Sequence, residues 1–125
     1  MQIARRSCPP GMGLGPPRIK AFLIDAAHTP LAQGEFTWEN RLPNGIWTYP
    51  MEEVWQGVQA AYAALAADVR AKHGTAMTAV GCIGVSAMMH GYLAFDENWN
   101  LLVPFRTWRN TMTAAAAAEL TAAFG

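Results

Sequence analysis

Residues 80–91 read VGCIGVSAMMHG, and this stretch decides the fold that the sequence predicts. Its first half, residues 80–85, is apolar without polar alternation, which is typical of a strand buried on both faces of a parallel sheet. The apolar run stops at Ser86, and two thioethers and the imidazole of His90 follow. Open α/β sheets bind ligands at the carboxyl ends of such strands, so we expect a binding site here. A purely structural histidine is the open alternative.

The composition indicates one small globular domain, or a piece of one. The chain has 125 residues, of which 52% are hydrophobic and 14% charged, and nine Lys and Arg balance nine Asp and Glu. No basic stripe is interleaved with aromatic residues, so nucleic acid is not an expected partner. No apolar run approaches the roughly 18 residues of a membrane span. Cys8 and Cys82 form no disulfide framework or zinc site, which favours a cytoplasmic protein with Cys82 in its core. The histidines lack metal-ligand spacing, so no metal site is predicted.

Residues 1–17 predict an irregular leader. They contain four of the eight prolines and no hydrophobic period. Glycines at 11, 13 and 15 superficially resemble a phosphate-binding loop. Such a loop follows a strand and works through backbone N–H groups, whereas Pro16 and Pro17 have none.

The middle of the chain predicts two strands and one long helix. Strands are expected at 18–24 and 31–38, the second half-buried with Ala32, Phe36 and Trp38 on its inner face. A helix is expected over 50–73, ended by Gly74. Its predicted core stripe is Val54, Trp55, Val58, Tyr62, Leu65 and Val69.

The loop at 39–50 and the last third of the chain are less regular. Trp47 and Tyr49 either form the floor of a sugar site or attach the loop to the following helix. Short strands are expected at 91–95 and 101–103, around a turn with solvated acids. An alanine-rich helix over 112–124, capped by Thr111 or Thr113, is expected to follow.

The segments 86–96, 101–104 and 107–111 together resemble the first domain of the FGGY carbohydrate kinases, the xylulokinase and glycerol kinase group. In that family the pattern is Ser-Gly-Gln-Met-His-Gly, a hairpin, then Trp-Asn-Asp. The resemblance covers about residues 18–125 in order and spacing. It implies an α/β fold, a partial ribonuclease-H-like (actin-type ATPase) domain with a mixed sheet and flanking helices. The expected domains are therefore the leader 1–17 and a partial N-terminal kinase domain at 18–125.

The resemblance also implies which residues bind substrate. Met89 and His90 would border a sugar, Trp108 would form an apolar wall, and Asn110 would stand near a further hydroxyl. Ala87 and Met88 replace the family's Gly and Gln, and Arg109-Asn110 replaces Asn-Asp, which speaks against a pentulose such as xylulose. The neutral Asn110 cannot act as a base. The family's catalytic aspartate lies further along the protein, so no catalytic residue is expected in this chain.

The ATP side of such a kinase is incomplete in this sequence. In the family, the first strand ends in an Asp-x-Gly-Thr-Thr-Ser loop that gathers the phosphates of ATP and Mg²⁺. Residues 13–18 fall on this loop and keep only Gly15 as a cofactor-binding position. Gly13 stands for the acid, and Pro16 and Pro17 stand for hydroxyl residues.

The predicted function is ATP-dependent phosphorylation of a sugar or polyol hydroxyl, with this chain supplying part of the sugar-binding side. The expected partners are the sugar or polyol and the missing C-terminal part of the kinase. The alternative is an inactive truncated kinase relic, or a fragment that binds a partner without catalysis. Because the phosphate-binding groups are missing, we predict that the chain alone transfers no phosphate.

Overall fold

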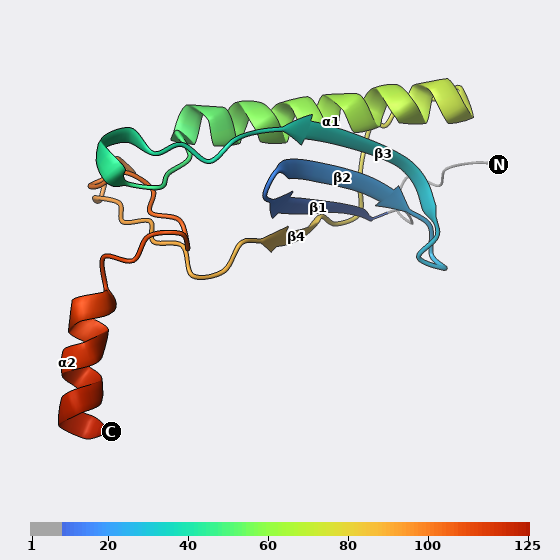
Figure 1. Cartoon of the computed structure of the whole chain (residues 1–125). Helices are drawn as coiled ribbons and strands as arrows, with labels where there is room; N and C mark the ends of the chain where they lie inside the picture. Colours follow the sequence, from blue (N-terminus) through green and yellow to red (C-terminus); the bar gives the residue numbers. More distant parts are fainter. Residues whose placement is uncertain (1–8) are drawn as a thin grey trace. The chain divides into compact units, whose positions relative to one another are not determined.

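The structure, a computed structural model, describes residues 9–125 and shows a mixed sheet with helices (Figure 1). The expectation for residues 1–8 lies outside the described residues. The elements in chain order are β1 (Pro10–Gly15), β2 (Arg18–Ile24), β3 (Pro30–Thr37), the 3₁₀ turn η1 (Pro43–Gly45), α1 (Met51–His73), β4 (Gly84–Ala87) and α2 (Ala114–Phe124). The predicted α/β class is therefore confirmed.

The chain divides into two compact units. The sheet unit comprises residues 9–39 and 51–88, and contains all four strands and α1. The loop unit comprises residues 40–50 and 89–125, and contains η1 and α2.

The sheet has the strand order β3-β2-β1-β4. β2 pairs antiparallel with both β1 and β3, whereas β4 pairs parallel with β1. Alternate residues of β2, namely Ile19, Ala21 and Leu23, are fully buried, while Arg18 and Lys20 are exposed. This period of two, with one covered face, is typical of a half-buried strand, which the sequence predicted for residues 31–38 but not for β2.

Helix α1 lies over β2 and β3, as Figure 1 shows, and packs against both strands. A Cβ atom on Gly34 would lie 2.2 Å from the backbone nitrogen of Leu65, so only glycine fits there. The helix buries Gly57, Ala61, Leu65 and Val69, one residue per turn. The predicted core stripe is wrong at Trp55 and Tyr62, which are 61% and 38% exposed. The close approach to β3 favours small residues on the contact ridge, and these two aromatics lie outside it.

The irregular leader predicted for residues 1–17 is wrong over Pro10–Gly15, which form β1. This strand is hydrogen-bonded on both sides, to β2 and to β4. The sequence pattern reflects side chains, and alternate glycines give no hydrophobic signal. The ladder uses backbone N–H and C=O groups, so pairing with two neighbours outweighs the poor strand propensity of glycine.

The buried strand predicted at 80–85 is also corrected. The strand lies at Gly84–Ala87 and all four of its residues are exposed. β4 is an edge strand whose only partner among the described residues is β1, and α1 does not reach it. Cys82, predicted to lie in the core, is an exposed free cysteine for the same reason.

The loop unit has less regular structure than the sequence suggested. The strands expected at 91–95 and 101–103 are reduced to single bridges, Tyr92 with Arg106 and Phe95 with Leu101. Helix α2 begins at Ala114, two residues later than expected, and Thr113 at its N-cap makes no side-chain capping bond. None of the α2 residues is buried.

Candidate functional site

The loop unit brings the segment that carries His90 beside the segment that carries Trp108. Tyr92 and Arg106 exchange both backbone hydrogen bonds, at N–O distances of 2.8 and 3.1 Å. A side chain at Gly91 would meet the Phe105 ring at 2.9 Å, so glycine allows the two segments to approach. The bridge is isolated. His90 has a left-handed backbone, and Trp108 lies in the turn in which the Asn110 N–H donates to the Thr107 carbonyl.

Asn110 joins this pair of segments to the loop at Trp47. Its Oδ1 accepts the Trp47 N–H at 2.9 Å. Its Nδ2 donates to the Trp47 carbonyl at 2.7 Å and to the Thr107 carbonyl at 2.9 Å. The Thr107 N–H also donates to the Trp47 carbonyl, at 3.1 Å. The amide of Asn110 is thus committed to the backbone, and in this structure it positions Trp47 rather than facing a ligand.

Trp47 and Trp108 both contact the guanidinium of Arg109. The Arg109 Cζ atom lies 4.8 Å from the ring centroid of Trp47 and 5.7 Å from that of Trp108. Both distances are in the range of cation–π attraction. The role of the loop aromatics as the floor of a sugar site stays a prediction. Trp47 contacts residues 107–110, and Tyr49, which is buried, has its ring 6.2 Å from that of Phe105.

The four residues predicted to bind substrate all lie in the loop unit. Met89 and Trp108 are 73% and 52% exposed, His90 is exposed, and Asn110 is half-buried. His90 has a left-handed backbone with φ of 61°. Their contact with a sugar stays a prediction. Trp47, which the sequence offered as a possible floor of a sugar site, is part of the same cluster, and so is Arg109, which sequence reasoning did not place in the site.

The acids near these segments hold turns. The Asp96 carboxylate accepts the backbone N–H groups of Asn98 and Asn100 and the Asn100 side-chain amide. The Asn100 side-chain bond, followed by its backbone bond, lowers the pKa of Asp96. Asp25 accepts the N–H groups of Ala27 and Thr29 in the same way. Neither carboxylate is arranged as a catalytic base.

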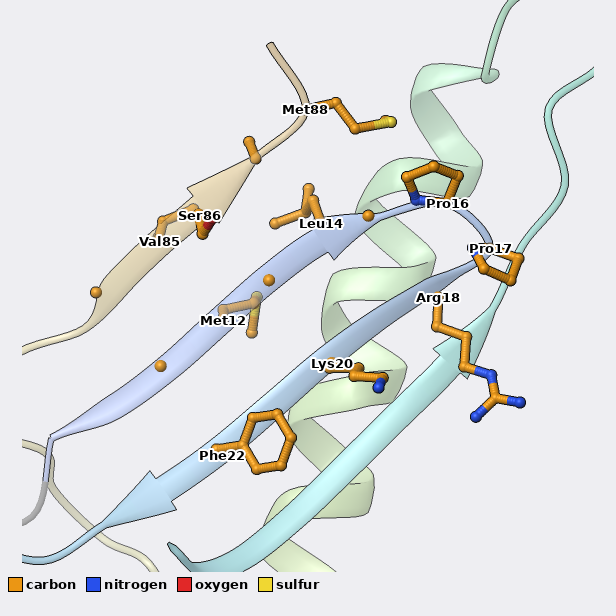
Figure 2. A pocket seen from close by; sticks show the side chains of 15 residues that line it. Met12, Leu14, Pro16, Pro17, Arg18, Lys20, Phe22, Val85, Ser86 and Met88 are labelled. Carbon is orange, nitrogen blue, oxygen red and sulfur yellow. The ribbon is translucent and has the colours of Figure 1, made fainter. Parts of the chain in front are cut away.

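The turn between β1 and β2 borders an open hollow of about 900 Å³ on the sheet unit. Figure 2 shows Pro16 and Pro17 at the turn, and Lys20 and Phe22 projecting from the side of the sheet away from α1. The Gly15 carbonyl accepts the Trp38 indole N–H at 3.0 Å. Ser86 carries the one hydroxyl among the residues that line the hollow, and none of those residues is acidic.

Comparison with known proteins identifies the family. Residues 11–124 match the FGGY family of carbohydrate kinases, N-terminal domain. The chain belongs to this family. No curated protein sequence matches it.

Solved structures of FGGY-type kinases share the fold. The chain is similar to a structure described as a xyloylose kinase from Brucella ovis, with 30% identity and a TM-score of 0.77, over 91% of this chain and 23% of that one. It is also similar to a xylulose kinase from Rhodospirillum rubrum (22% identity, TM-score 0.72, 91% and 23% covered) and to a glycerol kinase from Plasmodium falciparum (15% identity, TM-score 0.72, 94% and 23% covered). The chain thus spans about a quarter of the length of these kinases.

FGGY kinases use ATP, but the residues at the β1–β2 turn of this chain do not fit Mg·ATP. Pro16 and Pro17 offer neither a hydroxyl nor an N–H group, and Gly13 offers no carboxylate. A Cβ atom on Gly13 would meet no atom within 4 Å, so the missing acid reflects the sequence and not a lack of space. Within residues 9–125, no three His, Cys, Asp or Glu side chains gather as a metal site, and no helix is long and apolar enough to cross a membrane.

Proposed function

We propose that this chain supplies the sugar-binding side of an ATP-dependent carbohydrate kinase. The observation that carries the proposal is the position of His90, an exposed imidazole on the family's motif segment, two residues before the Tyr92–Arg106 bridge that joins this segment to the one carrying the exposed Trp108. An imidazole can donate to or accept from a sugar hydroxyl. The flat indole can cover the apolar C–H face of the same sugar.

The backbone of His90 supports a functional reason for its position. A left-handed conformation costs a non-glycine residue about 1–3 kcal/mol and is concentrated at turns and functional sites. His28 has the same conformation, with φ of 62°, but its N–H donates to the Asp25 carbonyl inside a closed turn. The described residues give the backbone N–H of His90 no such bond. The His90 side chain is exposed, so a sugar can reach it.

In this function, Met89, His90 and Trp108 bind and orient the acceptor hydroxyl, while Asn110 fixes the Trp47 loop beside them. Phosphoryl transfer also needs groups that hold the phosphates and a group that positions the nucleophile. The chain's own turn does not provide the first, so these parts belong to the remainder of a complete kinase. The exposed free thiol of Cys82 favours a reducing, cytoplasmic location.

A second candidate is an inactive kinase relic or a binding fragment. It is favoured by the β1–β2 turn, where Gly13 stands in place of the acid of the family's phosphate loop and Pro16 and Pro17 stand in place of its hydroxyl residues. The two candidates differ in sugar binding, because a relic has no reason to keep it. Both predict that the chain, mixed with ATP and a panel of pentuloses, hexuloses and polyols, releases ADP no faster than the protein-free mixture.

The test compares two histidines that share a conformation. The chain is titrated with the same sugar panel and followed by tryptophan fluorescence and by ligand-detected NMR. His90→Ala is expected to weaken binding of the preferred sugar by about 1–3 kcal/mol, since a sugar hydroxyl loses its partner. The matched control His28→Ala is expected to leave binding unchanged. Sugar binding that is equal in both variants, or absent in the unmodified chain, contradicts the proposed function.

A further inference from the structure

The guanidinium of Arg109 is an available cation inside the candidate sugar site. It touches the faces of Trp47 and Trp108, at 4.8 and 5.7 Å. Among the described residues it has no hydrogen bond and no ion pair, and its side chain is exposed. Neither ring offers the guanidinium an oxygen acceptor. Its five N–H donors lie in the plane and are free to bind an acceptor.

The two rings also restrict where this cation can be. Asn110 holds Trp47 in place, because its side chain accepts a hydrogen bond from the Trp47 backbone N–H and donates one to the Trp47 carbonyl. Trp108 is the residue next to Arg109 in sequence. A guanidinium held in this way loses less conformational freedom on binding than a free arginine, so its bidentate fork is partly pre-organised.

The loop unit suits an anion of one charge. Its other cations are Arg41 and Arg106, since it contains no lysine. Arg106 donates to the sulfur of Met112, and Arg41 is also engaged. One free arginine fork matches a carboxylate in charge and planar geometry. A phosphate monoester carries about −1.5 to −2 charges and would require more than one such group.

We infer that Arg109 makes this site selective for a carboxylated polyol, a sugar acid of the aldonate or uronate class, in preference to a neutral sugar. This inference rests on the proposed function, because it assumes that the polyol part of the ligand lies against His90 and Trp108. It gives a chemical reason for the residue at 109, where the family pattern has a neutral asparagine. The carboxylate would accept hydrogen bonds from the guanidinium fork.

The experiment uses pairs of ligands that differ in one group. The 125-residue chain is titrated at constant ionic strength with gluconate and with glucitol, and the Arg109 Nε–H resonance and tryptophan fluorescence are followed. We expect gluconate to bind about tenfold more tightly than glucitol, a modest ratio because the pair is exposed to water. Arg109→Gln is expected to reduce the ratio to about one, and Arg109→Lys to restore part of it. Arg70→Gln, which removes an exposed charge from the sheet unit, serves as the matched control and should leave the ratio unchanged.

The outcomes distinguish a failure of the acid selectivity from a failure of the proposed sugar site. Equal binding of gluconate and glucitol, with no effect of Arg109→Gln, overturns the acid selectivity and leaves the proposed sugar site intact. If neither ligand binds, the sugar site and the acid selectivity fail together. Acetate tests whether charge alone is bound, and a preference for acetate equal to that for gluconate contradicts a polyol acid. Tighter binding of glucose 6-phosphate than of gluconate overturns the carboxylate class.

Discussion

Restoring the family's acid at residue 110 should destabilise this chain. In Asn110→Asp, the oxygen that replaces Nδ2 would face the carbonyl oxygens of Trp47 and Thr107, now at 2.7 and 2.9 Å. Two donated hydrogen bonds are lost, each worth about 0.5–1.5 kcal/mol, and an anion is placed against two acceptors. We expect a total loss of about 2–4 kcal/mol at pH 7.

The loss should depend on pH, and its sign follows from the two carbonyl groups. They disfavour the carboxylate and accept a bond from the carboxylic acid, so the pKa of an aspartate here is higher in the folded chain than in the unfolded chain. The destabilisation is therefore full above the folded pKa and disappears as pH falls to the unfolded value of about 3.9. Asn110→Ala is the control, because it removes all three side-chain bonds and adds no titrating group.

Urea unfolding followed by tryptophan fluorescence measures the free energy, and amide exchange at Thr107 reports on the loop unit directly. The unfolding free energy of the Asp variant should rise relative to that of the Ala variant as pH falls from 7 to 4. An Asn110→Asp chain within about 0.5 kcal/mol of the unmodified chain at pH 7 would refute the clamp of Asn110 on Trp47.

Two further predictions concern the sheet unit. Gly34→Ala should lower the unfolding free energy by about 3 kcal/mol, because the new Cβ would lie 2.2 and 2.3 Å from backbone atoms of Leu65 and Ala61. In the control Gly13→Ala, the new Cβ meets nothing within 4 Å, so the unfolding free energy should change by less than about 1 kcal/mol. Similar urea midpoints for the two variants would contradict the packing of α1 on β3. The pKa of Asp68 is lowered from its ordinary 3.8 by the hydrogen bond from Lys72 and next by that from the Gln33 N–H. The contribution of Asp68 to stability is therefore complete above its unfolded pKa and lost as pH falls through its folded pKa. The difference in unfolding free energy between the unmodified chain and Asp68→Asn should become smaller in acid. A difference that does not depend on pH would be inconsistent with this pairing.

Local patterns predicted the parts of the fold that are covered by other residues. β2 was predicted with its observed bounds, β3 within one residue at each end and α1 to its last residue, because alternation, helical spacing and Gly74 are local signals. β1 and β4 were mispredicted since glycine ladders and exposed edges are determined by their neighbours. An apolar run such as residues 80–85 does not tell whether a covering layer is present.

In the candidate site, too, local sequence signals predicted some residues, while contacts between distant segments determined the rest. The sequence motif singled out His90 and Trp108, whose contact with a sugar stays a prediction, and the family match covers both residues. The clamp of Asn110 on Trp47 joins residues 63 positions apart, and the stacking of Arg109 follows from that clamp. An asparagine side chain often bonds to backbone groups, but nothing local indicates which backbone it will reach.

The most direct measurement of the central claim is a pair of titrations on one isotope-labelled chain, with a polyol panel and with Mg·ATP. If the chain carries the sugar side and lacks the phosphate side, amide resonances of residues 89–92 and 106–110 shift with a polyol. Those of residues 13–18 do not shift with Mg·ATP at millimolar concentration. Saturable shifts of residues 13–18 with Mg·ATP, or a polyol panel that moves no resonance in the loop unit, would contradict the account.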